Sequence, residues 1–203
     1  MIVVVDYGMG NLHSIAKALE CVGGNVLVSS KGEDIKKADK IVLPGVGAFR
    51  DGVANLKKRG LDKILISEVE KKKPLLGICL GMQLLANKSY EFGEYEGLSL
   101  IDSEVKKFNE SIQLRVPHMG WNNIEILKDH VLLKGVKNNS DFYFVHSYFM
   151  ECKNNEDVFA ECSYGSNFPV IVAKDNIFIT QFHPEKSQKN GLKILKNFAG
   201  WNM

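Results

Sequence analysis

One stretch decides how this chain folds: Lys73-Pro74-Leu75-Leu76-Gly77-Ile78-Cys79-Leu80-Gly81-Met82-Gln83-Leu84-Leu85-Ala86. Residues 75–78 are a short apolar run that starts after a proline, which is typical of a strand buried on both faces. Residues 82–86 are strong helix formers. The stretch therefore predicts a strand, a sharp turn and a helix, with Cys79 at the corner.

A cysteine at such a corner is placed for chemistry. A strand-to-helix elbow strains the backbone of its corner residue, and Gly77 and Gly81 let the two arms pass without a clash of Cβ atoms. The corner also lies at a helix N-terminus, where free N–H groups favour a thiolate over a thiol. We therefore expect Cys79 to present a nucleophile. The alternative is that Cys79 is a small apolar core residue, which is the commonest fate of an unpaired cysteine.

A base and a carboxylate follow near the C-terminus, in Gln181-Phe182-His183-Pro184-Glu185. This segment comes directly after a predicted strand at residues 177–180. Side chains two residues apart on an extended chain point the same way, and Pro184 keeps His183 out of the helical region. A thiol, an imidazole and an orienting carboxylate form a complete nucleophilic triad. Cys79, His183 and Glu185 are therefore the predicted catalytic residues.

With these two motifs the chain resembles the class I, triad-type glutamine amidotransferases. Within that family, three further motifs are similar to those of the glutaminase subunit of imidazole glycerol phosphate synthase: Asp6-Tyr7-Gly8-Met9-Gly10-Asn11, Pro44-Gly45-Val46-Gly47-Ala48-Phe49 and Pro117-His118-Met119-Gly120-Trp121-Asn122. The five motifs stand in the family's order, and the resemblance runs nearly end to end. It implies a flavodoxin-like α/β fold, with a mixed, twisted sheet flanked by helices, in a single type-1 glutamine amidotransferase domain over residues 1–203.

Length and composition also favour one domain. The chain has 203 residues, 45% of them hydrophobic, which is enough for one substantial core. Its 26 basic and 24 acidic residues leave a net charge of +2, so we expect no nucleic-acid partner. A basic leader and an apolar run of membrane-spanning length are both missing, so we expect a soluble, cytoplasmic protein that does not bind membranes. The four cysteines have neither metal-site nor disulfide-framework spacing.

The N-terminal unit predicts strand, helix and strand at residues 2–5, 11–22 and 26–29. Gly8-Met9-Gly10 between the first two elements suggests a dinucleotide-binding loop. The third glycine of that fingerprint is replaced by His13, and the second strand ends in Ser29-Ser30 where an acid is required. We therefore reject a dinucleotide cofactor. By the resemblance, this loop, including Asn11, lies at the rim that faces a partner subunit.

A second glycine-rich corner, Pro44-Gly45-Val46-Gly47, follows a predicted strand at residues 40–43. On its own it is equally consistent with a tight strand–helix turn. In the related family it is the oxyanion strand, whose N–H groups, together with the amide of Leu80 after the nucleophile, stabilise the negative oxygen. Many relatives have two adjacent glycines here, whereas Val46 separates Gly45 from Gly47. Because glycine tolerates both peptide orientations, we hypothesise that the 46–47 peptide points away from the oxyanion until a partner binds.

Two segments rich in aromatic residues, 116–122 and 141–148, contain further candidate residues. On residue types alone, ordinary strand packing with hydrogen-bonded histidines explains them. The resemblance implies instead that Gln83 and the main chain of His146, Ser147 and Tyr148 bind glutamine. It also implies that one set of residues lies at the partner interface, namely Asn11, His118, Met119, Trp121 and Asn122.

The resemblance implies a glutaminase that needs no metal and no organic cofactor. Cys79 attacks L-glutamine, a thioester forms, and ammonia passes to a TIM-barrel cyclase subunit that forms a heterodimer with this chain in histidine biosynthesis. Three alternatives remain at this point. The chain could supply a sugar amidotransferase of surface-polysaccharide synthesis, it could be a peptidase or other hydrolase on a similar fold, or it could be a non-catalytic regulatory module.

Overall fold

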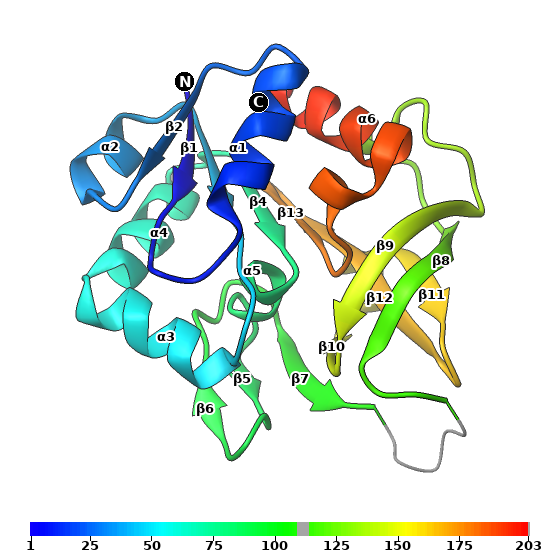
Figure 1. The fold of residues 1–203 in the computed structure, drawn as a ribbon. Coiled ribbons are helices and arrows are strands. Elements are labelled where there is room, and N and C mark those ends of the chain that lie inside the picture. Colours follow the sequence, from blue (N-terminus) through cyan, green and yellow to red (C-terminus); the bar gives the residue numbers. More distant parts are fainter. Residues whose placement is uncertain (109–113, 203) are drawn as a thin grey trace.

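A mixed sheet of nine strands runs through the middle of the molecule (Figure 1). The structure is a computed structural model and describes residues 1–108 and 114–202. In this part of the chain the strand order of the large sheet is β2-β1-β3-β4-β13-β12-β11-β8-β9. The predicted α/β fold with a mixed sheet is confirmed.

One half of the sheet is parallel. Its strands are β1 (Ile2–Val5), β2 (Val26–Ser29), β3 (Lys40–Leu43), β4 (Leu75–Ile78) and β13 (Ile177–Thr180). β4 lies between β3 and β13, with Leu43 opposite Gly77 and Thr180 opposite Ile78. The carboxyl ends of β3, β4 and β13 therefore meet at one edge, the usual position of a site in an open α/β sheet.

The other half is antiparallel and is built from the last part of the chain. It contains β12 (Asn167–Lys174), β11 (Val158–Ser163), β8 (His118–Ile126) and β9 (Ser140–His146). Pairing between β8 and β9 is long and places His118 directly opposite His146. This half therefore forms one wall beside the edge where the parallel strands end (Figure 1).

A small second sheet has the order β10-β7-β5-β6. Its strands are β10 (Tyr148–Cys152), β7 (Ser103–Lys107), β5 (Lys88–Ser89) and β6 (Tyr95–Glu96). A hairpin between residues 98–101 and 104–108 is also consistent with the sequence, but β7 pairs with β5 and β10, and residues 98–101 form no strand.

Helices cover both faces of the large sheet (Figure 1). α1 (Leu12–Cys21) and α6 (Gln188–Ala199) contribute to the core on one face. α2 (Gly32–Lys37), α3 (Phe49–Lys58) and α4 (Leu61–Glu70) contribute to the core on the other. Successive strand residues point to opposite faces, so in β1 Ile2 and Val4 pack with the first group and Val3 and Val5 with the second.

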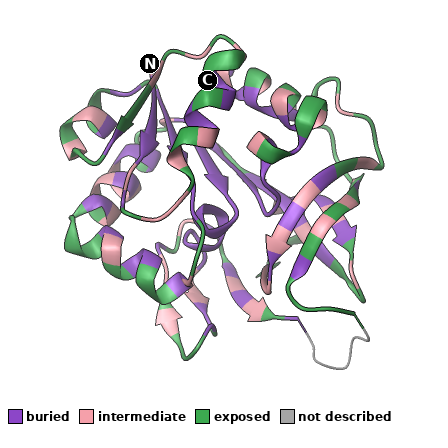
Figure 2. Cartoon of the chain, viewed as in Figure 1, coloured by how far each residue is buried: buried purple, intermediate pink, exposed green. Residues whose placement is uncertain are grey.

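The central strands are buried along their whole length (Figure 2). Every residue of β1, β3, β4 and β13 is buried, because helices cover both sides. The short helix α5 (Leu80–Gln83) and three 3-10 turns, η1 (Val131–Leu133), η2 (Asn155–Asp157) and η3 (Pro184–Lys186), complete the described elements. A rigid interior thus supports the sheet edge at which the candidate site lies.

Candidate active site

The elbow at Cys79 forms as predicted. β4 ends at Ile78, and Cys79 takes φ 54° and ψ −110° before α5 (Leu80–Gln83) begins. A positive φ at a residue with a side chain is strained and persists only where the surroundings enforce it. A Cβ on Gly81 would lie 1.8 Å from the Leu43 carbonyl oxygen, so only glycine lets the elbow pack against the end of β3.

The helix after the elbow is shorter than predicted. Residues 82–86 were expected to be helical, but α5 ends at Gln83. The carbonyls of Leu84 and Leu85 accept hydrogen bonds from the amides of Leu98 and Leu100, both at 2.9 Å. These tertiary bonds replace the helical ones, so they override local helix propensity and also keep residues 98–101 out of a strand.

Cys79 and His183 come from neighbouring parallel strands. The Cys79 amide donates to the Thr180 carbonyl at 2.8 Å, which ties the elbow to the end of β13. His183 follows three residues later, and its amide donates to the Tyr143 carbonyl at 3.0 Å. The sheet itself therefore brings the predicted nucleophile and the predicted base to one edge.

Glu185 orients the imidazole. His183 Nδ1 lies 2.8 Å from Glu185 Oε1, and both side chains are almost fully buried. Glu185 stands on the 3-10 turn η3, not on the extended backbone expected from sequence, but its carboxylate still reaches the ring. Because Nδ1 serves the carboxylate, Nε2 is left for the thiol, and Nε2 is buried with no hydrogen-bond partner.

Charge in this group favours the imidazolium. Burial alone would lower the pKa of His183, but the neighbouring Cys79 and Glu185 together raise the pKa of His183 above its ordinary value. An imidazolium at His183 in turn favours a thiolate at Cys79, so the two residues suit a thiolate–imidazolium pair. Cys79 Sγ has two further polar neighbours, each at 3.9 Å: the Val145 carbonyl and the Gln181 side-chain amide.

Cys79 lines a cavity of about 350 Å3. Cys79 is only 7% exposed, so it is deeper than the sequence prediction of a presented nucleophile indicated. Three of the oxyanion candidates line it, Val46, Gly47 and Leu80, and so do the glutamine-binding candidates Gln83, His146, Ser147 and Tyr148. The remaining lining residues are ones that the sequence did not single out for the site: Glu91, Phe92, Pro117 and Val145.

The oxyanion strand is anchored at one end and free at the other. The Tyr7 hydroxyl is buried and donates to the Pro44 carbonyl at 2.8 Å. It stands so close that a Cβ on Gly45 would lie 2.2 Å from the hydroxyl oxygen. Burial, and then the charge of Cys79, raise the pKa of Tyr7. Beyond Gly45, Val46 and Gly47 are exposed, and Gly47 has φ +105°.

The amide expected to bind the oxyanion is already occupied. Leu80 N–H donates to the Gly45 carbonyl at 3.3 Å. A carbonyl oxygen in that position blocks the donor and repels a developing negative charge. The structure therefore holds the oxyanion strand in a conformation that leaves this donor engaged.

The glutamine-binding candidates meet at the same wall. Gln83 is buried, and its amide donates to the Tyr148 carbonyl at 2.9 Å. His146 Nδ1 lies 2.8 Å from the same carbonyl. The Tyr148 carbonyl therefore accepts two hydrogen bonds, one from Gln83 and one from within the segment, and Ser147 also lines the cavity.

The interface candidates do not all reach the surface. Asn11, Met119 and Trp121 are exposed, at 63% for Met119 and 49% for Trp121. The assignment of His118 to the interface must be corrected, because this residue is 3% exposed and points into the core. Side chains alternate along β8, so His118 cannot share the outward face of Met119. Asn122 is half-buried and bonds to His118 and to the Ser163 carbonyl.

Sequence reasoning missed two buried side chains beside the cavity. Glu91 is 9% exposed, lines the cavity and accepts a hydrogen bond from the Phe49 amide. Burial raises the pKa of Glu91, and the Phe49 amide opposes that effect. Gln181 is fully buried and joins Gln83 to the thiol. Glu91 lies in an irregular loop with no periodic pattern, whereas Gln181 stands two residues before His183 and could have been found.

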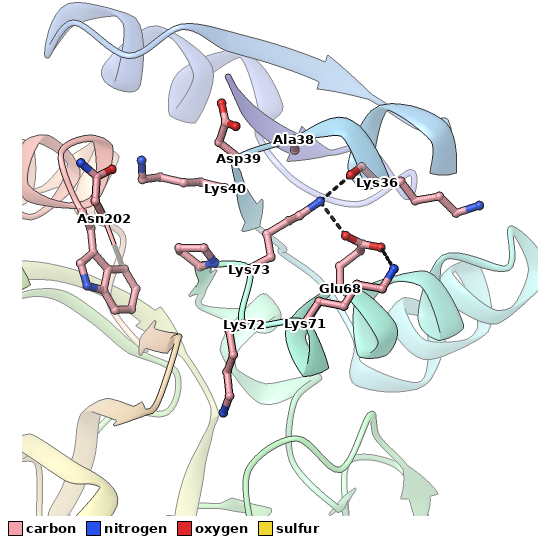
Figure 3. Close-up of a pocket in the computed structure, with 11 residues that line it drawn as sticks. Lys36, Ala38, Asp39, Lys40, Glu68, Lys71, Lys72, Lys73 and Asn202 are labelled. Atoms are coloured by element: carbon pink, nitrogen blue, oxygen red, sulfur yellow. Dashed lines mark hydrogen bonds and ion pairs between the residues drawn. The ribbon is translucent and has the colours of Figure 1, made fainter.

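A second hollow lies at the opposite edge of the sheet (Figure 3). Its described lining contains no cysteine, serine or histidine. Lys73 Nζ donates to the carbonyls of Ile35 and Lys36 and pairs with Glu68 at 2.6 Å. Lys73 thus caps the C-terminus of α2, while Lys71 pairs with Glu68 and Lys72 with Asp175, and all three roles are structural.

Neither a metal site nor a membrane span is found in the described ranges. Within residues 1–108 and 114–202, no group of three or more His, Cys, Asp or Glu side chains is placed to hold a metal ion. No helix in the same part of the chain is long and apolar enough to cross a membrane.

Comparison with known proteins agrees with this geometry. A family model described as "Glutamine amidotransferase class-I" matches residues 3–200. Among solved structures, a "glutamine amidotransferase" superposes with a TM-score of 0.77 at 19% identity, covering 98% of this chain and 99% of that one. "PurLQS from Thermotoga maritima" superposes with a TM-score of 0.74 at 17% identity, over 98% and 96%. These structural likenesses show the fold.

Curated relatives are much more similar in sequence. "Imidazole glycerol phosphate synthase subunit HisH 1" of Campylobacter jejuni is 52% identical over 98% of this chain and 99% of its own length. "HisH 2" of Pseudomonas aeruginosa is 46% identical, with 98% of each chain covered. HisH of Caldanaerobacter subterraneus is 47% identical over 98% and 97%.

Fold and motifs together define a class I glutamine amidotransferase. Within that class, the chain belongs to the family of HisH subunits of imidazole glycerol phosphate synthase.

Proposed function

We propose that this chain hydrolyses L-glutamine to glutamate and ammonia, with Cys79 as nucleophile, His183 as base and acid, and Glu185 as orienting carboxylate. The observation that carries the proposal is that Cys79 and His183 follow the ends of two paired parallel strands, with Cys79 on the wall of a cavity. Membership of the class I glutamine amidotransferases supplies the reaction class.

In the first half-reaction, His183 Nε2 takes the thiol proton and the sulfur attacks the side-chain carbonyl carbon of glutamine. The resulting tetrahedral oxyanion collapses as the imidazolium gives its proton to the departing nitrogen, which leaves as ammonia. A thioester remains on Cys79. Glu185 supports each step by holding Nδ1 and stabilising the charged ring.

In the second half-reaction, His183 takes a proton from water, and the hydroxyl attacks the thioester carbon. Collapse of this intermediate breaks the carbon–sulfur bond, releases glutamate and returns the proton to the sulfur. No residue other than the triad has to donate or accept a proton.

We propose that the oxyanion strand gates this chemistry. In the conformation described above, Leu80 N–H is engaged by the Gly45 carbonyl. Reorientation of the peptides between Gly45 and Gly47 would free that amide and turn a second N–H toward the oxyanion. Gly47, at φ +105°, allows such a change at small steric cost. The free subunit would then turn over slowly until a partner favours the reoriented form.

Specificity for a free amino acid follows from the cavity wall. Glutamine is a zwitterion at its α-carbon, so its site needs one acceptor for the ammonium and donors for the carboxylate. Glu91 is the buried carboxylate of this wall, and we assign it to the ammonium group. We assign the carboxylate to main-chain groups of residues 146–148, and we assign Gln83, whose amide donates to the Tyr148 carbonyl and to Gln181, to the support of that wall.

The chemistry requires a partner. Ammonia released into water is protonated and lost, so it must pass directly to the enzyme that consumes it. We propose that this chain, acting as one domain over residues 1–203 in the cytoplasm, forms a heterodimer with a TIM-barrel cyclase in histidine biosynthesis. The relatives named above carry the name of imidazole glycerol phosphate synthase. Exposed apolar side chains, Val46 on the cavity wall and Met119 and Trp121 on β8, are suited to such a contact.

The alternative of a sugar amidotransferase partner is not favoured by these relatives. Membership of the amidotransferase class disfavours a peptidase. The contact between His183 and Glu185 beside Cys79 argues against a non-catalytic regulatory module.

Copurification tests the proposal. The tagged chain is expressed in cells that also produce candidate cyclase and sugar-amidotransferase partners, and the purified complex is assayed for glutamate release and ammonia transfer. We expect the cyclase to copurify and the complex to release glutamate. Cleavage of peptides or esters without glutamine turnover would contradict the proposal, as would exclusive recovery of the sugar-modifying enzyme.

A further inference from the structure

Two buried histidines outside the triad are in direct contact. His118 Nδ1 and His146 Nε2 lie 3.0 Å apart, at paired positions of β8 and β9. His118 is 3% exposed and His146 6%. Histidines seldom share a buried site without a reason, because each polar nitrogen then needs a partner.

The hydrogen-bond partners define the tautomers. His146 Nδ1 faces the Tyr148 carbonyl at 2.8 Å and must carry a hydrogen, so its Nε2 is an acceptor. His118 Nδ1 must therefore donate to that acceptor. His118 Nε2 is left to accept from the Asn122 side-chain amide at 3.3 Å. These hydrogen bonds therefore run in one direction, from Asn122 through His118 and His146 to the Tyr148 carbonyl.

The series of hydrogen bonds continues to the nucleophile. The Tyr148 carbonyl that accepts from His146 also accepts from Gln83 Nε2 at 2.9 Å. Gln83 Nε2 also donates to Gln181 Oε1 at 3.0 Å, and Gln181 Nε2 approaches Cys79 Sγ at 3.9 Å. His146 thus shares one carbonyl acceptor with the side-chain amide of Gln83, which lines the glutamine cavity.

The surroundings keep both rings neutral. His118 stacks on Phe144 and Tyr164, with ring centroids 4.7 Å and 4.0 Å apart, and also packs beside Phe108 and Phe168. Burial lowers the pKa of His118 to about 4 and that of His146 to about 3. At neutral pH the pair can therefore keep the donor–acceptor order given above.

We propose that His118 is a positioning residue for glutamine binding: by donating to His146 Nε2 it fixes the Tyr148 carbonyl, and with it Gln83 and the 146–148 wall of the cavity. This inference rests on the proposed glutaminase function. His118 is not among the residues that line the cavity, and it reaches the cavity wall through its contact with His146.

Packing alone would not require a histidine here. The position is surrounded by aromatic rings, and phenylalanine would fill it with no polar atom to satisfy. Phenylalanine would also leave His146 Nε2 buried without a donor, which costs more than the loss of an ordinary hydrogen bond. Asparagine has the opposite properties, since its Nδ2 stands where the histidine Nδ1 stands but its side chain leaves space unfilled.

These two variants separate positioning from packing. We expect His118→Phe to raise the KM for glutamine about tenfold and to slow labelling of Cys79 by a chloroketone analogue of glutamine to the same degree. Alkylation of Cys79 by iodoacetamide, which needs no glutamine site, should stay within twofold of the parent. His118→Asn should bind glutamine better than His118→Phe although it melts at a lower temperature. The matched control is His130→Phe, at a half-buried histidine that caps η1 away from the cavity.

The assays use the full chain in complex with its cyclase. A parental complex that hydrolyses no glutamine would defeat the proposed function, whereas an active parent with an unchanged His118→Phe would defeat only this inference. The inference also fails if activity of the two variants follows melting temperature. Nitrogen-15 NMR of the parent histidines needs no variant: we expect hydrogens on Nδ1 of both His118 and His146 at neutral pH, and a hydrogen on either Nε2 would overturn the proposal.

Discussion

The elbow at Cys79 and the oxyanion strand at residues 44–47 belong to one candidate site but are held very differently. The elbow is fixed from several sides, by the bond from its amide to Thr180 and by the contact of Gly81 with the Leu43 carbonyl. The oxyanion strand is anchored at Pro44 by Tyr7, but Val46 and Gly47 are exposed. The nucleophile is therefore preorganised, whereas the oxyanion donors are not.

This difference shows where control can act. Rebuilding the elbow would require parts of a buried parallel sheet to move, whereas turning a peptide beside Gly47 requires little. We infer that a partner regulates the reaction through oxyanion stabilisation and leaves the position of the nucleophile unchanged. Substitutions in the two regions should consequently have different effects.

The largest effect is expected at the fixed half. Cys79→Ala removes the nucleophile, so glutamine hydrolysis by the complex should fall by about 10⁴-fold or more, with no loss of folding or of partner binding. The measurement is glutamate release per mole of complex. Cys162→Ala is the matched control, because Cys162 is a buried core cysteine whose pKa burial raises to about 12. An active Cys79→Ala variant would contradict the assignment of the nucleophile.

Glu185→Gln should have the next largest effect. Loss of the carboxylate misorients His183 and removes a negative charge that raises the pKa of His183, so kcat should fall about 100-fold. Because the imidazolium loses stabilisation, the alkaline limb of the pH profile should move to lower pH. The profile of kcat/KM checks this, with Glu156→Gln, an exposed glutamate, as control. A limb that moves to higher pH would reverse the assigned charge relation.

Tyr7→Phe tests the anchored end of the oxyanion strand. It removes the hydrogen bond to the Pro44 carbonyl, so the free energy of unfolding should fall by about 1 kcal/mol. The kcat of the complex should fall less than tenfold, with KM unchanged, because only the oxyanion strand is loosened. Tyr90→Phe, whose hydroxyl lies 3.3 Å from Glu104 on the surface, is the control. An altered KM would mean that Tyr7 acts on glutamine binding instead.

The elbow and the triad could be predicted because their signals are local. A buried strand, glycines around one cysteine, and His183-Pro184-Glu185 after a second strand are short patterns whose geometry follows from backbone chemistry. The sequence cannot show that β13 pairs with β4, but the resemblance to a known family implies that the two motifs meet.

Other features depend on contacts between distant segments. The helix after Cys79 ends early because the carbonyls of Leu84 and Leu85 accept hydrogen bonds from the amides of Leu98 and Leu100. His118 points inward because of its register opposite His146, which its neighbours in sequence do not reveal. Glu91 lines the cavity from a loop without any periodic pattern. In each case tertiary structure decides what local propensity leaves open.

The central claim is that the nucleophile is ready while the oxyanion strand is not. The most direct test compares the kcat for glutamine hydrolysis by this chain alone and in the presence of saturating cyclase and cyclase ligand. Since one oxyanion donor is worth about 10² to 10³ in kcat, we expect a rise of that size on adding the partner. Equal turnover with and without the partner would contradict the account.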